Sequence, residues 1–227
     1  MFEKEKMEII KGGMKLDRYG LISLAGGNLS LRMPSGELLV TPSGMIYEDM
    51  VADDVIVMDL DGKIIEGTRK PSSDTPAILY IFNQRPDVHA VIHTHQPYAT
   101  ALSLIEEGEF RADLTTLGNA CGGNVPIAPY SSPGSEEMGV DTVNYLGQGH
   151  AVILAHHGVM TTGDSLKQAL NAAVYLEECA KGYLAARAVG PTKHLTDAQI
   201  RQTVEIYKFV GQGHGEIPKE MLAREGM

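Results

Sequence analysis

The sequence predicts an α/β domain in which helices cover both faces of a mainly antiparallel or mixed sheet. Two observations predict this class. Segments with a helical spacing of apolar residues alternate along the chain with short apolar runs of strand length. The early strands are separated by tight turns rather than by helices, which favours antiparallel pairing. Because no linker-like stretch interrupts the 227 residues, we expect one domain over residues 1–227, with a loosely held tail at about residues 211–227.

The N-terminal third is predicted to contain one helix and a series of short strands. Apolar and charged residues have a helical spacing over residues 2–19, which predicts an amphipathic helix. A glycine-rich bend then opens an alternating strand within residues 25–32, and a further strand follows at residues 37–41. An Asp-Gly dipeptide lies at the centre of residues 55–66 between two apolar runs, which is the strongest short-range signal of a hairpin.

Helices alternate with apolar strands in the rest of the chain. Pro76 suits the first turn of a helix that reaches about Arg85, with Asp74 or a neighbouring residue as its N-cap. Further on, Asp164 can cap a long helix that ends at a Gly-Pro pair. The other predicted features are a strand at residues 88–95, a helix at 97–106, a glycine-rich stretch at 118–123, a helix at 135–146 capped by Ser135, a strand at 151–155 and a last helix at 196–210.

The overall charge restricts the partners of the protein. Its formal net charge is −10 and no basic run offsets it, so we expect neither a nucleic-acid partner nor a membrane partner. Any anionic substrate must be held by a local device, such as a metal ion or a group of backbone amides. The two cysteines do not make a disulfide framework and the charged N-terminus is not a signal peptide, so we expect a cytoplasmic protein.

Two histidines on one apolar strand are the first candidates for a functional site. His93 and His95 are two residues apart, so on a strand their imidazoles point to the same face. Neutral imidazoles in this arrangement suit a divalent metal ion, zinc above all. A second apolar run, at residues 151–155, leads into His156, His157 and a glycine-marked turn, and it supplies a third candidate ligand. The alternative is a pair of hydrogen-bonded core histidines.

Three polar, glycine-rich turns are candidates for a phosphate site. They lie at residues 26–28, 43–44 and 72–73. Backbone amides and hydroxyl groups in such turns bind phosphate without a net positive charge, although each turn alone also fits ordinary turn chemistry. Asp74 follows the third turn and has two compatible roles. It can cap the next helix, or its carboxylate can lie beside the metal as a ligand or a proton shuttle.

Five motifs occur in order along the chain: Gly-Gly-Asn-Leu-Ser at 26–30, Thr-Pro-Ser-Gly at 41–44, Lys-Pro-Ser-Ser-Asp-Thr-Pro at 70–76, His-Thr-His at 93–95 and His-Gly at 157–158. In this combination, over about residues 5–210, the chain resembles the class II aldolase/adducin family, which includes L-fuculose-1-phosphate aldolase and L-ribulose-5-phosphate 4-epimerase. The resemblance implies a three-layer α/β/α fold with a central, mainly antiparallel sheet. It also implies one zinc ion per subunit and a homotetramer with active sites between subunits.

The resemblance further implies a role for each motif. The metal ligands would be His93, His95 and His157, the histidine directly before the glycine. Asp74 would be the catalytic acid/base or a fourth metal ligand that is released as substrate binds. The implied phosphate-binding residues are Gly27, Asn28, Ser43, Gly44, Ser72 and Ser73.

Within the family, the chain matches neither the aldolases nor the epimerases completely. The stretch 66–76, with aspartate at position 74, is similar to the epimerases, whereas the aldolases have glutamate there. The second catalytic aspartate of the epimerases falls on Asn119, which cannot exchange a proton, and the aldolase tyrosines fall on Thr116 and Val210. The missing aspartate favours a zinc-dependent aldolase that cleaves a phosphorylated ketose to dihydroxyacetone phosphate and an aldehyde. The alternatives are a sugar-phosphate 4-epimerase and a non-catalytic, adducin-like module.

Overall fold

A mixed, mostly antiparallel sheet lies at the centre of the protein. The computed structural model describes residues 1–210 and 215–222. Within them the sheet has nine strands in the order β4-β3-β2-β1-β5-β9-β8-β7-β6. Every neighbouring pair is antiparallel except β7 and β8. The strands are β1 Asn28–Arg32, β2 Leu38–Val40, β3 Ile56–Met58, β4 Ile64–Glu66, β5 Ala90–Thr94, β6 Glu109–Phe110, β7 Val125–Ala128, β8 Ala151–Leu154 and β9 Gly158–Gly163.

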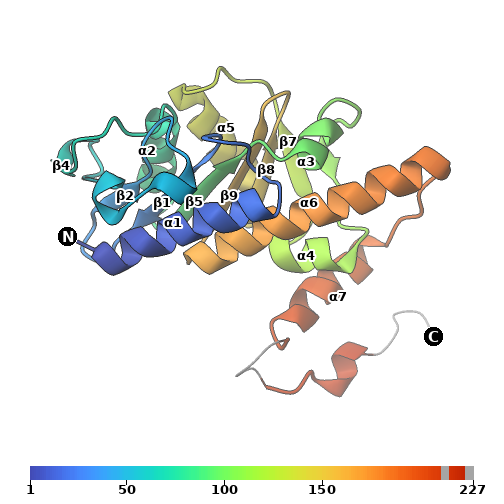
Figure 1. Cartoon of the computed structure of the whole chain (residues 1–227). Helices are drawn as coiled ribbons and strands as arrows, with labels where there is room; N and C mark the ends of the chain where they lie inside the picture. The colour runs from blue at the N-terminus through green and yellow to red at the C-terminus, as the bar shows by residue number, and fades with distance from the viewer. Residues whose placement is uncertain (211–214, 223–227) are drawn as a thin grey trace.

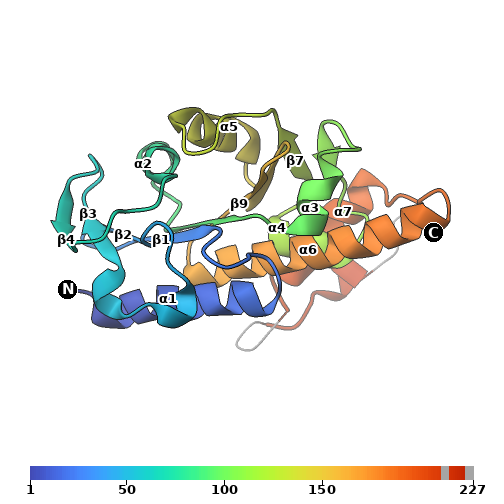
Figure 2. The ribbon, with the colours of Figure 1, turned by 45° about the horizontal axis from the view of Figure 1, so that its top comes forward.

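Helices cover both faces of this sheet, as the sequence predicts (Figures 1 and 2). Helices α1 and α6 pack on one face and α2 and α5 on the other. Successive strand residues serve opposite faces: Leu39 packs in the core under α1, whereas Leu38 and Val40 pack under α2. The helices are α1 Glu3–Arg18, α2 Thr75–Gln84, α3 Pro97–Leu102, α4 Thr115–Cys121, α5 Glu136–Leu146, α6 Leu166–Val189 and α7 Asp197–Tyr207, with short 3₁₀ turns at Tyr47–Asp49, Ala52–Asp54 and Lys219–Leu222.

Several elements of the structure were not predicted from the sequence. Strand β9, the two-residue strand β6 and helix α4 were not predicted, and α4 occupies part of the glycine-rich stretch at 118–123. β9 begins and ends with glycine, so its sequence has a weak strand signal. Its position in the sheet comes instead from long-range pairing with β5 and β8. The hairpin β8–β9 is the element that presents the second histidine motif.

One predicted helix cap is wrong, and another is confirmed in position only. The side chain that caps α6 belongs to Ser165 and not to Asp164, since the Ser165 hydroxyl accepts from the backbone N–H of Gln168 at 3.3 Å. Ser135 occupies the N-cap position of α5, but its hydroxyl donates to the carbonyl oxygen of Ser132 at 2.7 Å. Helix α3 is also shorter than predicted, ending at Leu102.

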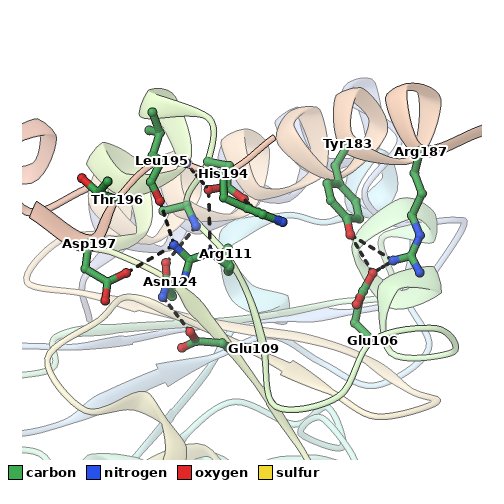
Figure 3. A network of polar contacts seen from close by, with 12 residues as sticks. Glu106, Glu109, Arg111, Asn124, Tyr183, Arg187, His194, Leu195, Thr196 and Asp197 are labelled. Carbon is green, nitrogen blue, oxygen red and sulfur yellow. Dashed lines mark hydrogen bonds and ion pairs between the residues drawn. The ribbon is translucent and has the colours of Figure 1, made fainter. Parts of the chain in front are cut away.

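The C-terminal helix α7 is attached to the body by a polar network (Figure 3). Arg111 donates to the carbonyl oxygen of Leu195 at 3.0 Å and to Asp197 at 3.3 Å. Asp113 accepts from the backbone N–H of Leu195 and pairs with His194. The expected loose tail falls largely on residues 211–214 and 223–227, which lie outside the described residues. In the described part, no helix is both long and apolar enough to cross a membrane.

Candidate metal centre and active site

The pairing of strand β5 with strand β9 fixes the orientation of His93. The residue lies in β5, which pairs with β9, and its buried ring reaches Val159 of that strand. The Nδ1 atom lies 3.0 Å from the carbonyl oxygen of Val159. Because a carbonyl oxygen only accepts, this contact assigns the proton to Nδ1 and leaves a lone pair on Nε2. That lone pair points toward His95, whose Nε2 is 3.0 Å away.

The turn between β8 and β9 brings a third imidazole to the same point. His95 follows the end of β5, and His157 lies in the turn just before Gly158. One ligand nitrogen from each of His93, His95 and His157 lies within 4.8 Å of the others. His156 does not join this group; it has a left-handed backbone with φ of 59°, its side chain is exposed, and its backbone N–H donates to Ser103. The turn therefore directs His157, and not His156, toward the cluster.

The chemistry of these three side chains fits a divalent metal ion. Burial lowers the pKa of His93 to about 3, and burial also lowers the pKa of His157. Both imidazoles are therefore neutral, the form that binds metal ions. In a tetrahedral zinc site, nitrogen ligands lie about 3.3 Å apart, close to the 3.0 Å between the two Nε2 atoms of His93 and His95. The Nδ1 atom of His157 is buried and has no hydrogen-bond partner among the described residues.

Gly158 makes this close approach of three rings possible. A Cβ atom at this position would lie 2.3 Å from the carbonyl oxygen of Thr94, and 3.2 Å from ring carbons of both His93 and His95. Any side chain here would therefore separate β9 from β5 and displace the imidazoles. The glycine after His157 is a structural requirement of the cluster.

Asp74 lies at the N-cap position of α2, but its side chain does not cap that helix. The carboxylate turns toward the histidines instead. Its Oδ2 accepts from the side-chain amide of Asn28 at 2.7 Å and lies 3.9 Å from Nε2 of His93. Asn28 is the residue directly opposite His93 in the pairing of β1 with β5, so the same register places all three side chains together. Of the two roles predicted for Asp74, the structure excludes the side-chain cap.

The three polar turns meet beside this cluster. They line a cavity of about 160 Å³ together with His95 and His157. The lining residues are Ala25, Gly26, Gly27, Asn28, Pro42, Ser43, Gly44, Ser72, Ser73, Asp74, His95, Pro133 and His157. All six residues predicted for a phosphate site are thus in one cavity, and no lysine or arginine of the described chain lines it. An anion there would be held by amides and hydroxyl groups.

Backbone pairing between two loops holds the turns in place. The backbone N–H of Ser43 donates to Lys70 at 2.9 Å, and the N–H of Ser72 donates to Thr41 at 3.1 Å. A bridge between Pro42 and Pro71 lies between these two bonds. The loops after β2 and before α2 therefore form one unit, although about thirty residues separate them in the sequence.

The three positions that the resemblance aligns with further catalytic residues of the family do not line this cavity. Thr116 and Asn119 lie on α4, and Val210 follows α7; none of the three is among the lining residues. A larger cavity of about 600 Å³ lies between α1 and α6 and contains none of the predicted site residues.

Comparisons with known proteins agree with this arrangement. Residues 7–184 match the family described as Class II Aldolase and Adducin N-terminal domain. The chain is 32% identical over 213 residues to 5-deoxy-D-ribulose 1-phosphate aldolase of Bacillus thuringiensis serovar kurstaki, covering 93% of this chain and 99% of that protein. It is also 32% identical to the 5-methylthioribulose-1-phosphate/5-deoxyribulose-1-phosphate aldolase of Rhodospirillum rubrum, covering 89% of this chain and 90% of that one.

A solved structure of an L-fuculose 1-phosphate aldolase has the same fold. It superimposes with a TM-score of 0.85 and 34% sequence identity, over 90% of this chain and 96% of the other. The resemblance noted in the motifs, and the α/β fold with a mostly antiparallel central sheet that it implied, are both confirmed.

Proposed function

Since the chain belongs to the class II aldolase and adducin N-terminal domain family, we propose that it is a zinc-dependent aldolase that cleaves a phosphorylated ketose. The products would be dihydroxyacetone phosphate and an aldehyde. The observation that supports this most strongly is the cluster of three imidazoles, with one buried carboxylate and three polar turns beside it at one cavity. Two relatives that are 32% identical over most of the chain are named as aldolases of ketose 1-phosphates.

His93, His95 and His157 would hold one zinc ion in each subunit. A zinc ion bound there supplies Lewis-acid polarisation of a substrate carbonyl group. The Val159 carbonyl contributes by fixing the tautomer of His93, so that Nε2 keeps its lone pair without a change of protonation. Ring nitrogens presented this way are ready to bind the ion before the substrate arrives.

The phosphate group of the substrate would bind at the opposite end of the cavity. Gly27, Asn28 and the loop pairs Ser43-Gly44 and Ser72-Ser73 offer backbone N–H groups, hydroxyl groups and one side-chain amide. Gly27 has a φ of +75°, and a Cβ atom there would lie 2.6 Å from the carbonyl oxygen of His93, so the bend must be glycine. The turn therefore lies directly against the strand that carries a candidate metal ligand, and a phosphate group bound at this turn would lie close to an ion bound by the histidines.

Asp74 would move a proton during cleavage. When the bond between C3 and C4 breaks, its electron pair moves toward the C2 carbonyl group, a proton leaves the C4 hydroxyl group, and another is added at C3. Asp74 is the one carboxyl group in the cavity lining of the described residues, and Asn28 fixes its orientation. We assign it one of these two transfers.

The first substrate to test is a 5-deoxyribulose 1-phosphate, because both relatives carry that name. Zinc-loaded protein would be assayed with it, with L-fuculose 1-phosphate and with L-ribulose 5-phosphate. Release of dihydroxyacetone phosphate establishes the aldolase. Inversion at C4 without cleavage, detected by NMR, would instead establish the 4-epimerase that the aspartate at position 74 favours. A purified chain that neither contains nor takes up zinc would leave only the adducin-like module.

We further propose that the active protein is a homotetramer. The number of subunits is what the resemblance to the family implies, and the size of the cavity in one chain supports a neighbouring subunit that completes it, because about 160 Å³ is below the ~300–1,000 Å³ of typical small-molecule sites. Sedimentation analysis tests this, and a monomer with full activity would contradict it.

A further inference from the structure

The position of His95 depends on the backbone that carries it. Its side chain is exposed, and its one polar contact within the described residues is the 3.0 Å approach to His93. Unlike His93, it has no carbonyl oxygen on a neighbouring strand to orient its ring. The position of its imidazole therefore depends on the short backbone segment between the end of β5 and the start of α3.

Gln96, the next residue, ties this segment to α6. The side chain of Gln96 is fully buried. Its oxygen accepts from the hydroxyl of Thr94 at 2.6 Å, and its nitrogen donates to the carbonyl oxygen of Ala173 at 3.2 Å. Because Ala173 belongs to α6, the residue after the candidate ligand is anchored to this long helix.

Glu177 provides a second anchor one turn further along α6. Its carboxylate is 1% exposed, and it accepts from the backbone N–H of Tyr98 at 3.0 Å and of Ala99 at 2.9 Å. These groups belong to the first turn of α3, which lies beside α6 (Figures 1 and 2). A buried carboxylate is costly unless its oxygens are hydrogen-bonded, and here each oxygen has one backbone donor. This carboxylate is not among the residues that line the cavity, and its hydrogen bonds hold α3.

We infer that Glu177 is a positioning residue for the metal centre: it holds the first turn of α3 on α6 and so fixes the segment that presents His95. Gln96 supports the same segment from its other end. The inference rests on the proposed metal site. It extends that proposal by a residue from α6, an element that contributes no side chain to the cavity. Without Glu177, two backbone N–H groups lose their partners and the segment is free to shift.

The test compares zinc affinity in three variants of the metal-free full-length chain, measured by competition with a chromogenic chelator. Glu177→Gln keeps the shape but can no longer accept at both atoms, so we expect affinity to fall by about tenfold or more. Glu178→Gln alters the exposed neighbour, which pairs with Lys181, and should leave affinity at the wild-type value. Leu176→Ala removes a fully buried side chain from the same helix and should lower the melting temperature without weakening zinc binding.

The three variants separate the possible outcomes. Weaker zinc binding in Glu177→Gln alone supports the inference, because a general loss of stability would affect Leu176→Ala in the same way. Equal affinity in Glu177→Gln and the wild type would overturn the inference and leave the proposed function intact. Failure of the wild type to bind zinc would remove both. If Glu177→Gln does not fold, Glu177→Asp, which keeps the charge on a shorter side chain, is measured with the same expectation.

Discussion

The side-chain amide of Asn28 donates to Oδ2 of Asp74 at 2.7 Å and holds that carboxylate at the histidine cluster. Both side chains are buried, and the two residues are 46 positions apart in the sequence. They meet because Asn28 is paired with His93 across β1 and β5, while Asp74 enters from the loop before α2. The hydrogen bond turns the Asp74 carboxylate away from the helix that it was expected to cap and toward the cavity that it lines.

Replacing Asp74 with asparagine tests whether its carboxylate moves a proton. Asparagine keeps the size and can still accept a hydrogen bond from Asn28, but it cannot take up or release a proton. We expect normal folding and a loss of turnover of about 100-fold or more. Steady-state kinetics and a thermal melt of the same preparation check both parts. A turnover near that of the wild type would show that Asp74 acts only through its hydrogen bonds.

Removing one imidazole should remove the metal and the activity together. His95→Ala leaves two of the three nitrogens, so we expect it to be purified without stoichiometric zinc and without measurable turnover. His156→Ala is the matched control, because that residue is exposed and lies outside the cluster. Zinc content by atomic absorption and activity are measured for both variants. Activity in a metal-free His95→Ala protein would contradict the metal site.

The candidate site was largely predictable because its motifs are local. The His-x-His spacing, the glycine-rich bend and the Ser-Ser-Asp turn each specify a short local geometry, and residues of each motif line one cavity. Most of the helices were predictable for the same reason, since the 3.6-residue spacing of their apolar residues is visible within one continuous stretch of sequence.

What the sequence did not reveal depends on partners far along the chain. Strand β9 has a weak strand signal of its own, and its pairing with β5 is set by the backbone contact of Gly158 with Thr94. Glu177 looks like any other acidic residue of an amphipathic helix until α3 is placed against it. The turning of Asp74 away from α2 likewise requires Asn28, which lies on another strand. Local propensity cannot report such contacts.

A methyl group at Gly158 should disturb both the fold and the metal site. In Gly158→Ala the Cβ atom would meet the Thr94 carbonyl oxygen at 2.3 Å, which is backbone and cannot rotate away. We expect the free energy of unfolding to fall by about 2 kcal/mol or more, with weaker zinc binding. Gly190→Ala is the control, because an added Cβ there meets nothing within 4 Å and the φ of 173° suits any residue. Urea unfolding measures the stability of the two variants, and equal stability would mean that β9 can shift to accommodate the methyl group.

The ion pair between Lys6 and Glu66 should make stability depend on pH. Lys6 is 2% exposed, its Nζ lies 2.6 Å from Oε1 of Glu66, and hydrogen bonds from Lys6 and the N-terminal amine hold the pKa of Glu66 below its usual range. The unfolded state therefore binds a proton more readily than the folded state. The stabilisation is complete above the unfolded pKa of about 4.5 and is lost as the pH falls through the lower folded value.

Substitution of Glu66 tests that pH dependence directly. At pH 7, Glu66→Gln should lower the free energy of unfolding by about 1–2 kcal/mol, a value reduced because Glu66 is partly exposed. The difference from the wild type should shrink as the pH is lowered below about 4.5, where the carboxylate of the unfolded state begins to bind a proton, and should be lost below the lower pKa of the folded state. Glu8→Gln is the control, since its pair with Lys4 is exposed and 3.9 Å apart, and it should change stability little at any pH. Urea titrations over this pH range decide the matter: a Glu66→Gln difference that stays constant with pH would show that the pair stabilises by packing rather than by charge.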